Sequence, residues 1–302
     1  MKHVNRRHFL KETAAAGAAL SLLSASPAVF AQSRSDIVVV KNASPVELVR
    51  TAVEKLGGMQ RFVKKGDQVL LKPNIAWDRS PEQAATTNPE AVAEVVKMCR
   101  EAGAKNVLVL DRTCNQARRC YRNSQIEKAA KEAGATVRHV IDARFEKMDI
   151  PQGEYVNSWD VYRDVMDSDV MINMPIAKTH GISTLTLGMK NLMGVLGGNR
   201  GGLHRNFHEK IVDINTAIVP DLTIIDAYRI LTANGPSGGN LEDVKLTKTV
   251  IAGTNTVSVD ACATGLFGLK PTDIGFLVTA HERGMGEIDL NKLAIETVDL
   301  SA

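Results

Sequence analysis

The segment Gln68-Val69-Leu70-Leu71-Lys72-Pro73-Asn74 decides the fold class of this sequence. Its apolar run follows a Lys-Gly-Asp turn and stops at a proline, which is typical of a short strand buried on both faces. Similar runs recur along the chain and alternate with amphipathic segments. This alternation predicts an α/β fold in which a mainly parallel sheet carries helices on both faces, in Rossmann-like layers.

The other expected elements follow from the same two patterns. Strands are predicted over residues 37–40, 68–71, 106–110, 136–141, 169–174, 222–226 and 249–252. Helices are predicted over residues 44–56, 88–102, 124–133, 209–218 and 257–267. Residues 176–207 are instead rich in glycine and polar side chains and show neither pattern. We expect them to form a long functional insertion at the rim where the strands end.

The first residues have the pattern of an export signal. Asn5-Arg6-Arg7-His8-Phe9-Leu10-Lys11 precedes an uncharged, alanine-rich run that closes on Val29-Phe30-Ala31. A charged head, a modest apolar run and small residues before the cleavage point predict a cleavable signal; the alternative is an uncleaved anchor. The paired arginines predict export by the twin-arginine translocase to the periplasm. We therefore expect a signal peptide over residues 1–31 and an α/β domain over residues 32–302.

The basic charge of the chain belongs to this leader. The whole sequence has a formal net charge of +3. Residues 1–31 hold four basic residues and one acidic residue, so residues 32–302 are close to neutral. A near-neutral domain lacks the electrostatic footprint of a polyanion-binding protein, and we do not expect a nucleic-acid partner.

The four cysteines, Cys99, Cys114, Cys120 and Cys262, all follow the leader. They are scattered, with no Cys-x-x-Cys pair, so this chain carries no iron-sulfur or zinc-ribbon motif. In an oxidising compartment Cys114 and Cys120 either close a short disulfide loop or remain thiols, and the sequence leaves both open. Cys99 and Cys262 lie in apolar helical patterns and are expected as buried thiols.

Polar residues follow several of the predicted strands. They are Lys72, Asn74, Asp111, Arg112, Lys178, Thr179, His180 and Asp226. In open α/β sheets, ligands bind beyond the carboxyl ends of the strands, where such side chains converge. We therefore predict the functional site at this rim, with Lys178, His180 and Asp226 as catalytic residues.

The mixture of residue types at this rim suits an anionic ligand. Lysine supplies a point charge, while amides and hydroxyls orient a carboxylate or phosphate. The Gly-rich loop from Asn234 to Gly239 either adds backbone N–H groups or is a plain surface turn, since it lacks the spacing of a nucleotide motif. The predicted ligand-binding residues are Lys72, Asn74, Thr179, Thr184, Lys190, Asn191, Gly235, Gly238 and Asp260.

Two histidines are candidates for metal binding. His204 and His208 are four residues apart and share one face if the segment is helical, an arrangement that binds divalent metals in other proteins. The sequence between them is not that of a His-Glu-x-x-His motif, and the alternative is a solvated or capping pair. A divalent metal is thus the candidate cofactor, and no other cofactor is predicted.

Taken in order, the motifs of this chain resemble the prokaryotic family catalogued as domain of unknown function 362. The resemblance is carried by Gly66 to Asn74, Asp169 to Pro175, Lys178-Thr179-His180, Thr184, Thr186, Lys190-Asn191, Met193-Gly194, Ile225-Asp226-Ala227, Asn234 to Gly239, Val259-Asp260-Ala261 and Gly268 to Pro271. It covers most of the chain after the leader. Members of the family are often joined to ferredoxin-like segments, which implies redox surroundings. Because this sequence lacks the ferredoxin cysteine run, any such cluster would lie on a ferredoxin-like partner.

Two classes of function follow from these patterns. The first is an exported enzyme that binds a small anionic substrate or cofactor at the strand ends, with metal assistance and in a redox setting. The second is a non-catalytic periplasmic protein that captures a metal or cofactor, or acts as an accessory factor. The second class would use the same rim but would need no proton-transfer group.

Overall fold

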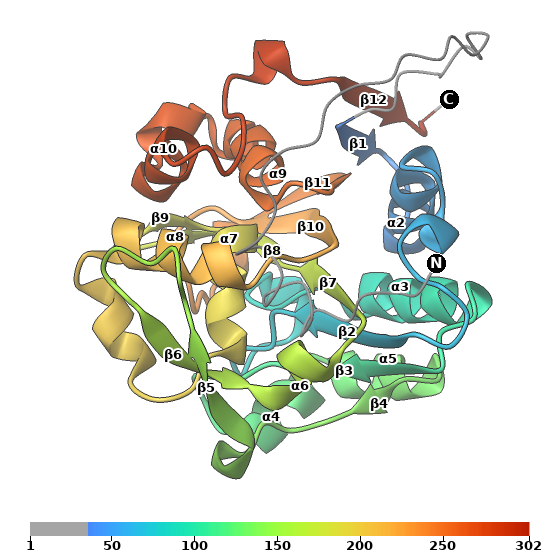
Figure 1. The fold of residues 1–302 in the computed structure, drawn as a ribbon. Helices are drawn as coiled ribbons and strands as arrows, with labels where there is room; N and C mark the ends of the chain where they lie inside the picture. Colours follow the sequence, from blue (N-terminus) through green and yellow to red (C-terminus); the bar gives the residue numbers. More distant parts are fainter. Residues whose placement is uncertain (1–35, 302) are drawn as a thin grey trace, which may run out of the picture.

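The computed structural model of the protein describes residues 36–301 (Figure 1). The signal peptide predicted for residues 1–31 lies outside the described residues. Within the described part of the chain, no helix is long and apolar enough to cross a membrane. The α/β fold rests on one large sheet together with a separate two-stranded hairpin.

Ten strands of residues 36–301 form the large sheet. They are β1 (Ile37–Lys41), β2 (Gln68–Pro73), β3 (Asn106–Val109), β4 (Thr136–Val137), β7 (Val170–Met174), β8 (Ile176–His180), β9 (Thr184–Thr186), β10 (Leu222–Leu231), β11 (Val244–Gly253) and β12 (Ile295–Asp299). The main path has the order β12-β1-β11-β10-β7-β2-β3-β4, and β8 lies beside β10 and β9. The neighbours from β10 through β7, β2 and β3 to β4 are parallel, and β11 runs antiparallel between β10 and β1. The predicted, mainly parallel sheet is therefore confirmed.

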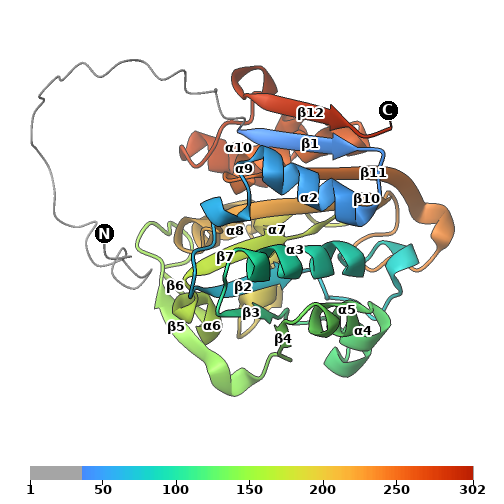
Figure 2. The same cartoon turned by 90° about the vertical axis from the view of Figure 1, so that its right-hand side faces the viewer.

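Helices cover both faces of this sheet, as Figure 2 shows from the side. On one face lie α2 (Pro45–Lys55), α3 (Pro89–Glu101), α4 (Ala117–Asn123) and α5 (Ile126–Glu132). On the other face lie α6 (Arg163–Asp167), α7 (Gly188–Asn191), α8 (Phe207–Ala217), α9 (Thr256–Ala263), α10 (Gly275–Glu282) and the hairpin β5 (Phe145–Asp149) with β6 (Ser158–Tyr162). The side chains of β2 alternate between these two layers: Val69 and Leu71 pack with the first, and Leu70 packs with the second. Both faces are apolar, which is why the strand sequence shows no polar alternation.

Local sequence signals explain where the first helices begin. Ser44 caps α2 through a capping box with Glu47, and Pro45 occupies the first turn. Asn88 caps α3 by accepting from the backbone N–H groups of Glu90 and Ala91. Each cap satisfies backbone donors that the first turn of a helix leaves unpaired. These two helix starts agree with the sequence prediction.

Some elements differ from the prediction. The strand expected over residues 136–141 is confined to Thr136–Val137, and the helix expected over 124–133 begins only at Ile126, after a separate helix α4. Residues 176–207 are not irregular: they form β8, β9, α7 and the 3-10 turns Leu192–Val195 and Arg200–His204. These elements are too short to give the sequence a hydrophobic period, and this is why the sequence predicted no regular structure here.

Candidate functional site

A pocket of about 400 Å³ opens at the carboxyl ends of β2 and β3, beside the insertion. Its polar lining comes from Lys72 on β2 and Asn74 just after it, Asp111 and Arg112 after β3, and Lys178 and His180 on β8. The insertion adds Thr186, Lys190, Asn191, Arg200 and His204. Because the carboxyl ends of parallel strands meet at one edge, residues far apart in the sequence line one pocket here. The prediction of a site at this rim agrees with this geometry.

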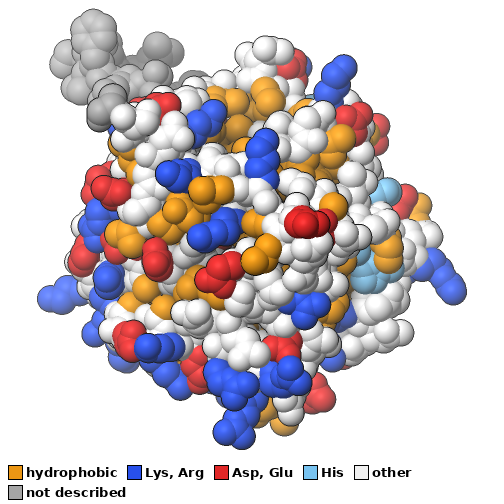
Figure 3. Space-filling view, turned by 180° about the vertical axis from the view of Figure 1, so that it is seen from behind, with side chains coloured by type: hydrophobic (Ala, Val, Ile, Leu, Met, Phe, Trp, Pro, Cys, Tyr) orange, Lys and Arg blue, Asp and Glu red, His pale blue; other side chains and the backbone are white. Residues whose placement is uncertain are grey.

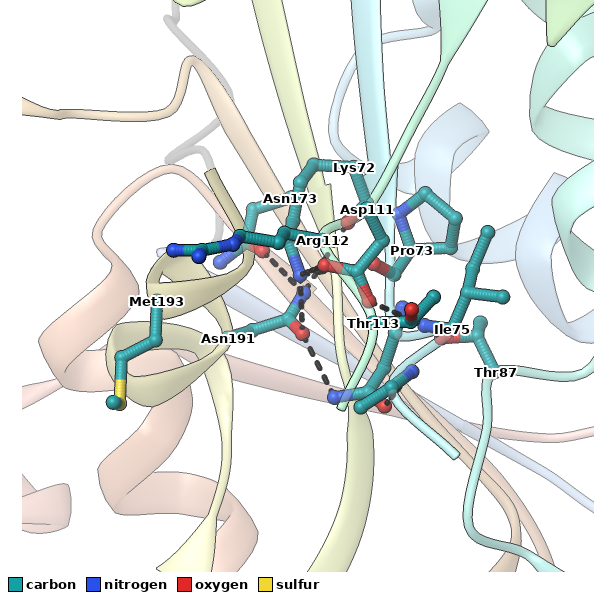
Figure 4. A network of polar contacts seen from close by, with 12 residues as sticks. Lys72, Pro73, Ile75, Thr87, Asp111, Arg112, Thr113, Asn173, Asn191 and Met193 are labelled. Atoms are coloured by element: carbon teal, nitrogen blue, oxygen red, sulfur yellow. Dashed lines mark hydrogen bonds and ion pairs between the residues drawn. The ribbon is translucent and has the colours of Figure 1, made fainter. Parts of the chain in front are cut away.

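Lys72 occupies the centre of a closed hydrogen-bond network (Figure 4). Its Nζ lies 2.9 Å from Asp111 Oδ1, 2.8 Å from Asn191 Oδ1 and 3.0 Å from the carbonyl oxygen of Pro73. Burial lowers the pKa of Lys72, and the Asp111 carboxylate opposes that fall. One ion pair and two hydrogen bonds thus surround the ammonium of Lys72. Lys72 lines the pocket, and these three contacts hold it against Asp111 and Asn191.

Gly194 provides the space for this network. A Cβ at that position would overlap Asp111 Oδ1 and the Nζ of Lys72. The carbonyl oxygen of Gly194 accepts from the backbone N–H of Arg112 at 2.7 Å. Close backbone approach of this kind is possible only for glycine. The glycine of the Met-Gly motif therefore allows the insertion to pack against the ends of β2 and β3.

Lys178 faces the same pocket from β8 with a different set of partners. Its Nζ donates to the carbonyl oxygen of Ala85 at 2.6 Å and to Asn74 Oδ1 at 3.3 Å, and 1% of the residue is exposed. Among residues 36–301, no carboxylate lies within ion-pair distance of this nitrogen. Burial is the main cause that lowers the pKa of Lys178 to about 7. This amine therefore exchanges its proton near neutral pH.

Thr186 lies directly opposite Lys178 in the antiparallel pair β8–β9. Side chains of opposed residues in such a pair stand on the same face of the sheet, about 5 Å apart at Cβ. The Thr186 side chain lines the pocket and is buried, and within the described part of the chain its hydroxyl finds no hydrogen-bond partner. A buried hydroxyl without a partner is costly unless a ligand or water satisfies it.

Lys190 adds a third cation at the end of α7. Its Nζ lies 4.4 Å from the centroid of the Phe207 ring and 3.6 Å from the sulfur of Met193. Burial is the main cause that lowers the pKa of Lys190 to about 8. A ring face and a thioether are weak partners for an ammonium, so strong donors of Lys190 remain for an anion.

Two arginines complete the basic lining, and carbonyl oxygens hold both in place. Arg112 Nη1 donates to Leu196 and Gly198, and Arg200 donates to Arg112, Met193 and Thr113. Five basic side chains thus line the pocket, against one carboxylate, that of Asp111, which is paired with Lys72. The uncompensated positive charge makes this pocket attractive to anions.

His180 and His204 stand face to face at the pocket. Their ring centroids are 5.9 Å apart and their planes differ by 11°. His180 Nδ1 accepts from the backbone N–H groups of Ile182 and Ser183, which assigns the proton of His180 to Nε2. His204 Nδ1 lies 3.2 Å from the carbonyl oxygen of Gly201, which makes Nδ1 the donor and leaves Nε2 as an acceptor. The pocket therefore holds one imidazole donor and one imidazole acceptor.

Both imidazoles are neutral at neutral pH. Burial and then the charge of Lys190 lower the pKa of His180 to about 3. The same two causes, in the same order, lower the pKa of His204. Neutral imidazoles are the forms that donate or accept a proton without adding charge to the site.

Asp226, predicted as a catalytic residue, does not line the pocket. Its carboxylate accepts from the backbone N–H groups of Asn88, at 2.7 Å, and Tyr228, at 3.0 Å, and it is buried. Burial raises the pKa of Asp226 to about 6. In this structure Asp226 fixes the segment before α3 to the centre of β10, and its predicted catalytic role stays a prediction.

Other predicted ligand residues also lie outside the pocket lining. Asp260 accepts from the backbone N–H groups of Gly188 and Met189 and so anchors the start of α7. Thr179 lies between Lys178 and His180 and points to the opposite face of β8, where its hydroxyl accepts from Gly235. Thr184 is exposed, and Gly238 contacts Arg79 and Leu231. The nearby loop reaches the pocket through Pro236, the neighbour of Gly235.

The structure does not place the predicted metal pair on one helix face. His204 ends one 3-10 turn and His208 lies in α8, which begins at Phe207, so they do not share one helix face. A Cβ on Gly275 would meet the ring of His208, whereas His204 faces His180. Among residues 36–301, no group of three or more His, Cys, Asp or Glu side chains is placed to hold a metal ion. His204 belongs to the pocket, and His208 packs against α10.

Several lining residues were not predicted as ligand residues. They are Ala76, Trp77, Asp111, Arg112, Cys114, Ile182, Thr186, Met193, Gly194, Arg200, Gly201 and Pro236. Cys114 and Cys120 are both free thiols, with Cys114 exposed and Cys120 buried. Trp77 lies in a loop and Arg200 begins a 3-10 turn, and neither segment shows a hydrophobic period in the sequence that would mark these residues.

The fold and the pocket together define an α/β protein with a basic pocket at the carboxyl rim of a parallel sheet. Residues 69–265 match the model of the family described as domain of unknown function DUF362. The thylakoid-associated protein sll1697 of Synechocystis sp. is 31% identical over 245 residues, which cover 78% of this chain and 74% of that protein. The chain belongs to the DUF362 family, as its motifs indicated.

Two solved structures are similar at 12% sequence identity. The lactate racemase apoprotein from Thermoanaerobacterium thermosaccharolyticum gives a TM-score of 0.45, covering 72% of this chain and 54% of that one. A protein from Thermotoga maritima gives 0.43, covering 74% and 59%. This chain thus spans a little over half of each of those two chains.

Proposed function

We propose that the protein binds a small organic anion, a carboxylate or a phosphate ester, in the rim pocket. The observation that carries this proposal is the charge of the lining: five basic side chains face one carboxylate, and that carboxylate is already paired. Buried positive charge without a counter-ion is unfavourable, and an anionic ligand relieves it.

Three groups supply the contacts. Lys190 offers an ammonium that only a ring face and a thioether contact, and Lys178 offers a second nitrogen deeper in the pocket. The unpartnered hydroxyl of Thr186 provides a neutral hydrogen bond beside Lys178. Charge-assisted hydrogen bonds of this kind give both affinity and orientation.

The size and walls of the pocket favour an organic molecule. A volume of about 400 Å³ is within the range of small-molecule sites. Trp77, Ile182, Met193 and Pro236 add apolar surface to the lining. Such walls suit a ligand with a carbon body and an anionic end, because the body is desolvated while the charge meets the lysines.

We propose that the protein is an enzyme and not a non-catalytic binding or accessory protein. Both classes would use the same lysines. The complementary tautomers favour the enzyme, since the Nε2 of His204 is placed to take a proton and the Nε2–H of His180 to stabilise developing negative charge. Tight binding without any turnover would favour the second class.

Calorimetric titration of the full chain with inorganic phosphate and with pyruvate tests the proposal. Lys190→Gln removes the least satisfied cation, and we expect affinity to fall about tenfold to a hundredfold, as for a hydrogen bond to a charged group. Lys128→Gln is the matched control, because Lys128 lies on the exposed face of α5 with 78% of its side chain accessible. Absence of binding by every anion tried, or equal affinity in the two variants, would refute the proposal.

Export to the periplasm by the twin-arginine translocase, in a redox setting, remains part of the proposed function. It rests on the sequence of residues 1–31 and on the family resemblance. Fractionation of cells that express the full chain tests the route. We expect the wild type in the periplasm and the Arg6→Lys, Arg7→Lys variant in the cytoplasm. Equal distribution of the two forms would exclude this route.

A further inference from the structure

The hydrogen bonds of Lys178 distinguish it from an ordinary anion-binding lysine. Its Nζ has two acceptors, the carbonyl oxygen of Ala85 and Asn74 Oδ1, and both are neutral. A neutral primary amine has two N–H groups and one lone pair. If both N–H groups go to these acceptors, the lone pair remains available at the pocket surface that Lys178 lines.

The surroundings match the needs of a carbonyl reaction. Thr186, opposite Lys178 on β9, has a buried hydroxyl without a partner in the described part of the chain and so offers a hydrogen bond to an oxygen near that amine. Lys190 supplies a separate cation for a carboxylate. His180 lies two residues from Lys178 on the same face of β8 and carries its proton on Nε2.

We propose that Lys178 forms a reversible imine with a small 2-oxo acid or aldehyde acid whose carboxylate is held by Lys190. This inference rests on the proposed anion site and names the substrate class of that site. The lone pair of Nζ attacks the carbonyl carbon, and a carbon–nitrogen bond forms. Both N–H hydrogens then leave with the former carbonyl oxygen as water, which gives the C=N bond with no other reactant.

Two further properties support this reaction. Burial lowers the pKa of Lys178 to about 7, so about half of the molecules hold the nucleophilic, neutral amine at that pH. The contrast with Lys72 is sharp, because Lys72 is surrounded by three acceptors, including the Asp111 carboxylate, and so has no free lone pair. Of these two buried lysines, only Lys178 has the hydrogen-bond geometry of an amine nucleophile.

Reductive trapping of the full chain tests the inference. The protein is incubated with pyruvate or glyoxylate, reduced with sodium cyanoborohydride, digested and mapped by mass spectrometry. We expect the reduced adduct mainly on Lys178, absent without the oxo acid, lowered at least about tenfold in Lys190→Gln and unchanged in Lys128→Gln. Because the peptide map locates the adduct in the wild-type protein, the result does not depend on how a Lys178 variant folds.

The outcomes separate this inference from the proposed function. An adduct spread evenly over exposed lysines, or no adduct although pyruvate binds in calorimetry, overturns the imine and leaves the anion site in place. No adduct together with no binding of phosphate or pyruvate overturns both. Inorganic phosphate should also suppress trapping by competing for Lys190, and failure to compete would argue against a shared site.

Discussion

The β2 side and the β8 side of the pocket each place a buried lysine at the end of a strand, and the two are built differently. On the β2 side, Lys72 is enclosed by Asp111, Asn191 and the Pro73 carbonyl. On the β8 side, Lys178 has two neutral acceptors. This difference shows that burial alone does not decide whether a lysine supports the structure or binds a ligand. A lysine whose donors are all used supports the structure, and one with unused capacity is available to a ligand.

The largest expected effect separates the two lysines by stability. Lys72→Met leaves the buried Asp111 carboxylate without its cation, and we expect a loss of about 3–5 kcal/mol in the free energy of unfolding. Lys178→Met removes a buried amine that has no carboxylate partner, and we expect no loss of stability at pH 7, because burial disfavours the charged form of this amine. Urea unfolding of both variants measures this difference. Equal losses would remove the distinction between the two sides.

A smaller effect is expected where the insertion packs against the β2 side. Gly194→Ala forces a Cβ into the space of Asp111 and Lys72, and overpacking of this kind costs about 1–3 kcal/mol. Anion affinity should fall as well, because the neighbouring Asn191 and Lys190 would shift. Gly181→Ala is the control, since a Cβ there meets no atom within 4 Å. If Gly194→Ala folds and binds like Gly181→Ala, the insertion is not held by this contact.

Asp226 tests whether the boundary of the site is drawn correctly. Asp226→Asn keeps one acceptor for the backbone N–H groups of Asn88 and Tyr228, and we expect a loss of about 1–2 kcal/mol in stability. Pyruvate affinity should not change, because the residue does not line the pocket. A fall in affinity without a fall in stability would return Asp226 to the functional site.

A pH dependence of stability is expected on the β8 side. The folded protein holds the pKa of Lys178 near 7, below its usual value, so the unfolded chain binds more protons above that pH. The stability of the wild type relative to Lys178→Met should therefore rise between about pH 7 and pH 10, by about 1 kcal/mol per pH unit or less. Urea unfolding at pH 7 and pH 9 checks the sign. A constant difference would mean that Lys178 titrates as an exposed lysine does.

Much of the fold was predictable from the sequence, because the strands of the parallel sheet are continuous apolar runs. The position of the pocket at the rim was predictable too, since Lys72, Asn74 and Lys178 lie at or just after the ends of such strands. The two sides could not be told apart, because the hydrogen bonds of a lysine depend on residues such as Ala85 and Asn191 that are distant in sequence. The position of Asp226 outside the pocket lining could not be predicted, because its partners are backbone N–H groups, which no sequence pattern displays.

The predicted arrangement of the two histidines differs from the structure for a similar reason. The i, i+4 spacing of His204 and His208 requires one continuous helix, whereas α8 begins only at Phe207. His180 faces His204 instead, across a sequence distance that spacing rules do not cover. Thr186 was not predicted as a ligand residue, because only the pairing of β8 with β9 places it opposite Lys178.

Anomalous diffraction from crystals of the full chain soaked in bromide tests the central claim most directly. The uncompensated positive charge lies on the β8 side of the pocket and on the insertion. We therefore predict a bromide ion within contact distance of Lys190 Nζ, close to Thr186 or Lys178. This bromide should be absent from crystals of Lys190→Gln. Two results would contradict the account. In the first, bromide binds exposed lysines elsewhere but not the pocket. In the second, bromide lies beside Lys72, where the account places the Asp111 carboxylate as the only anion.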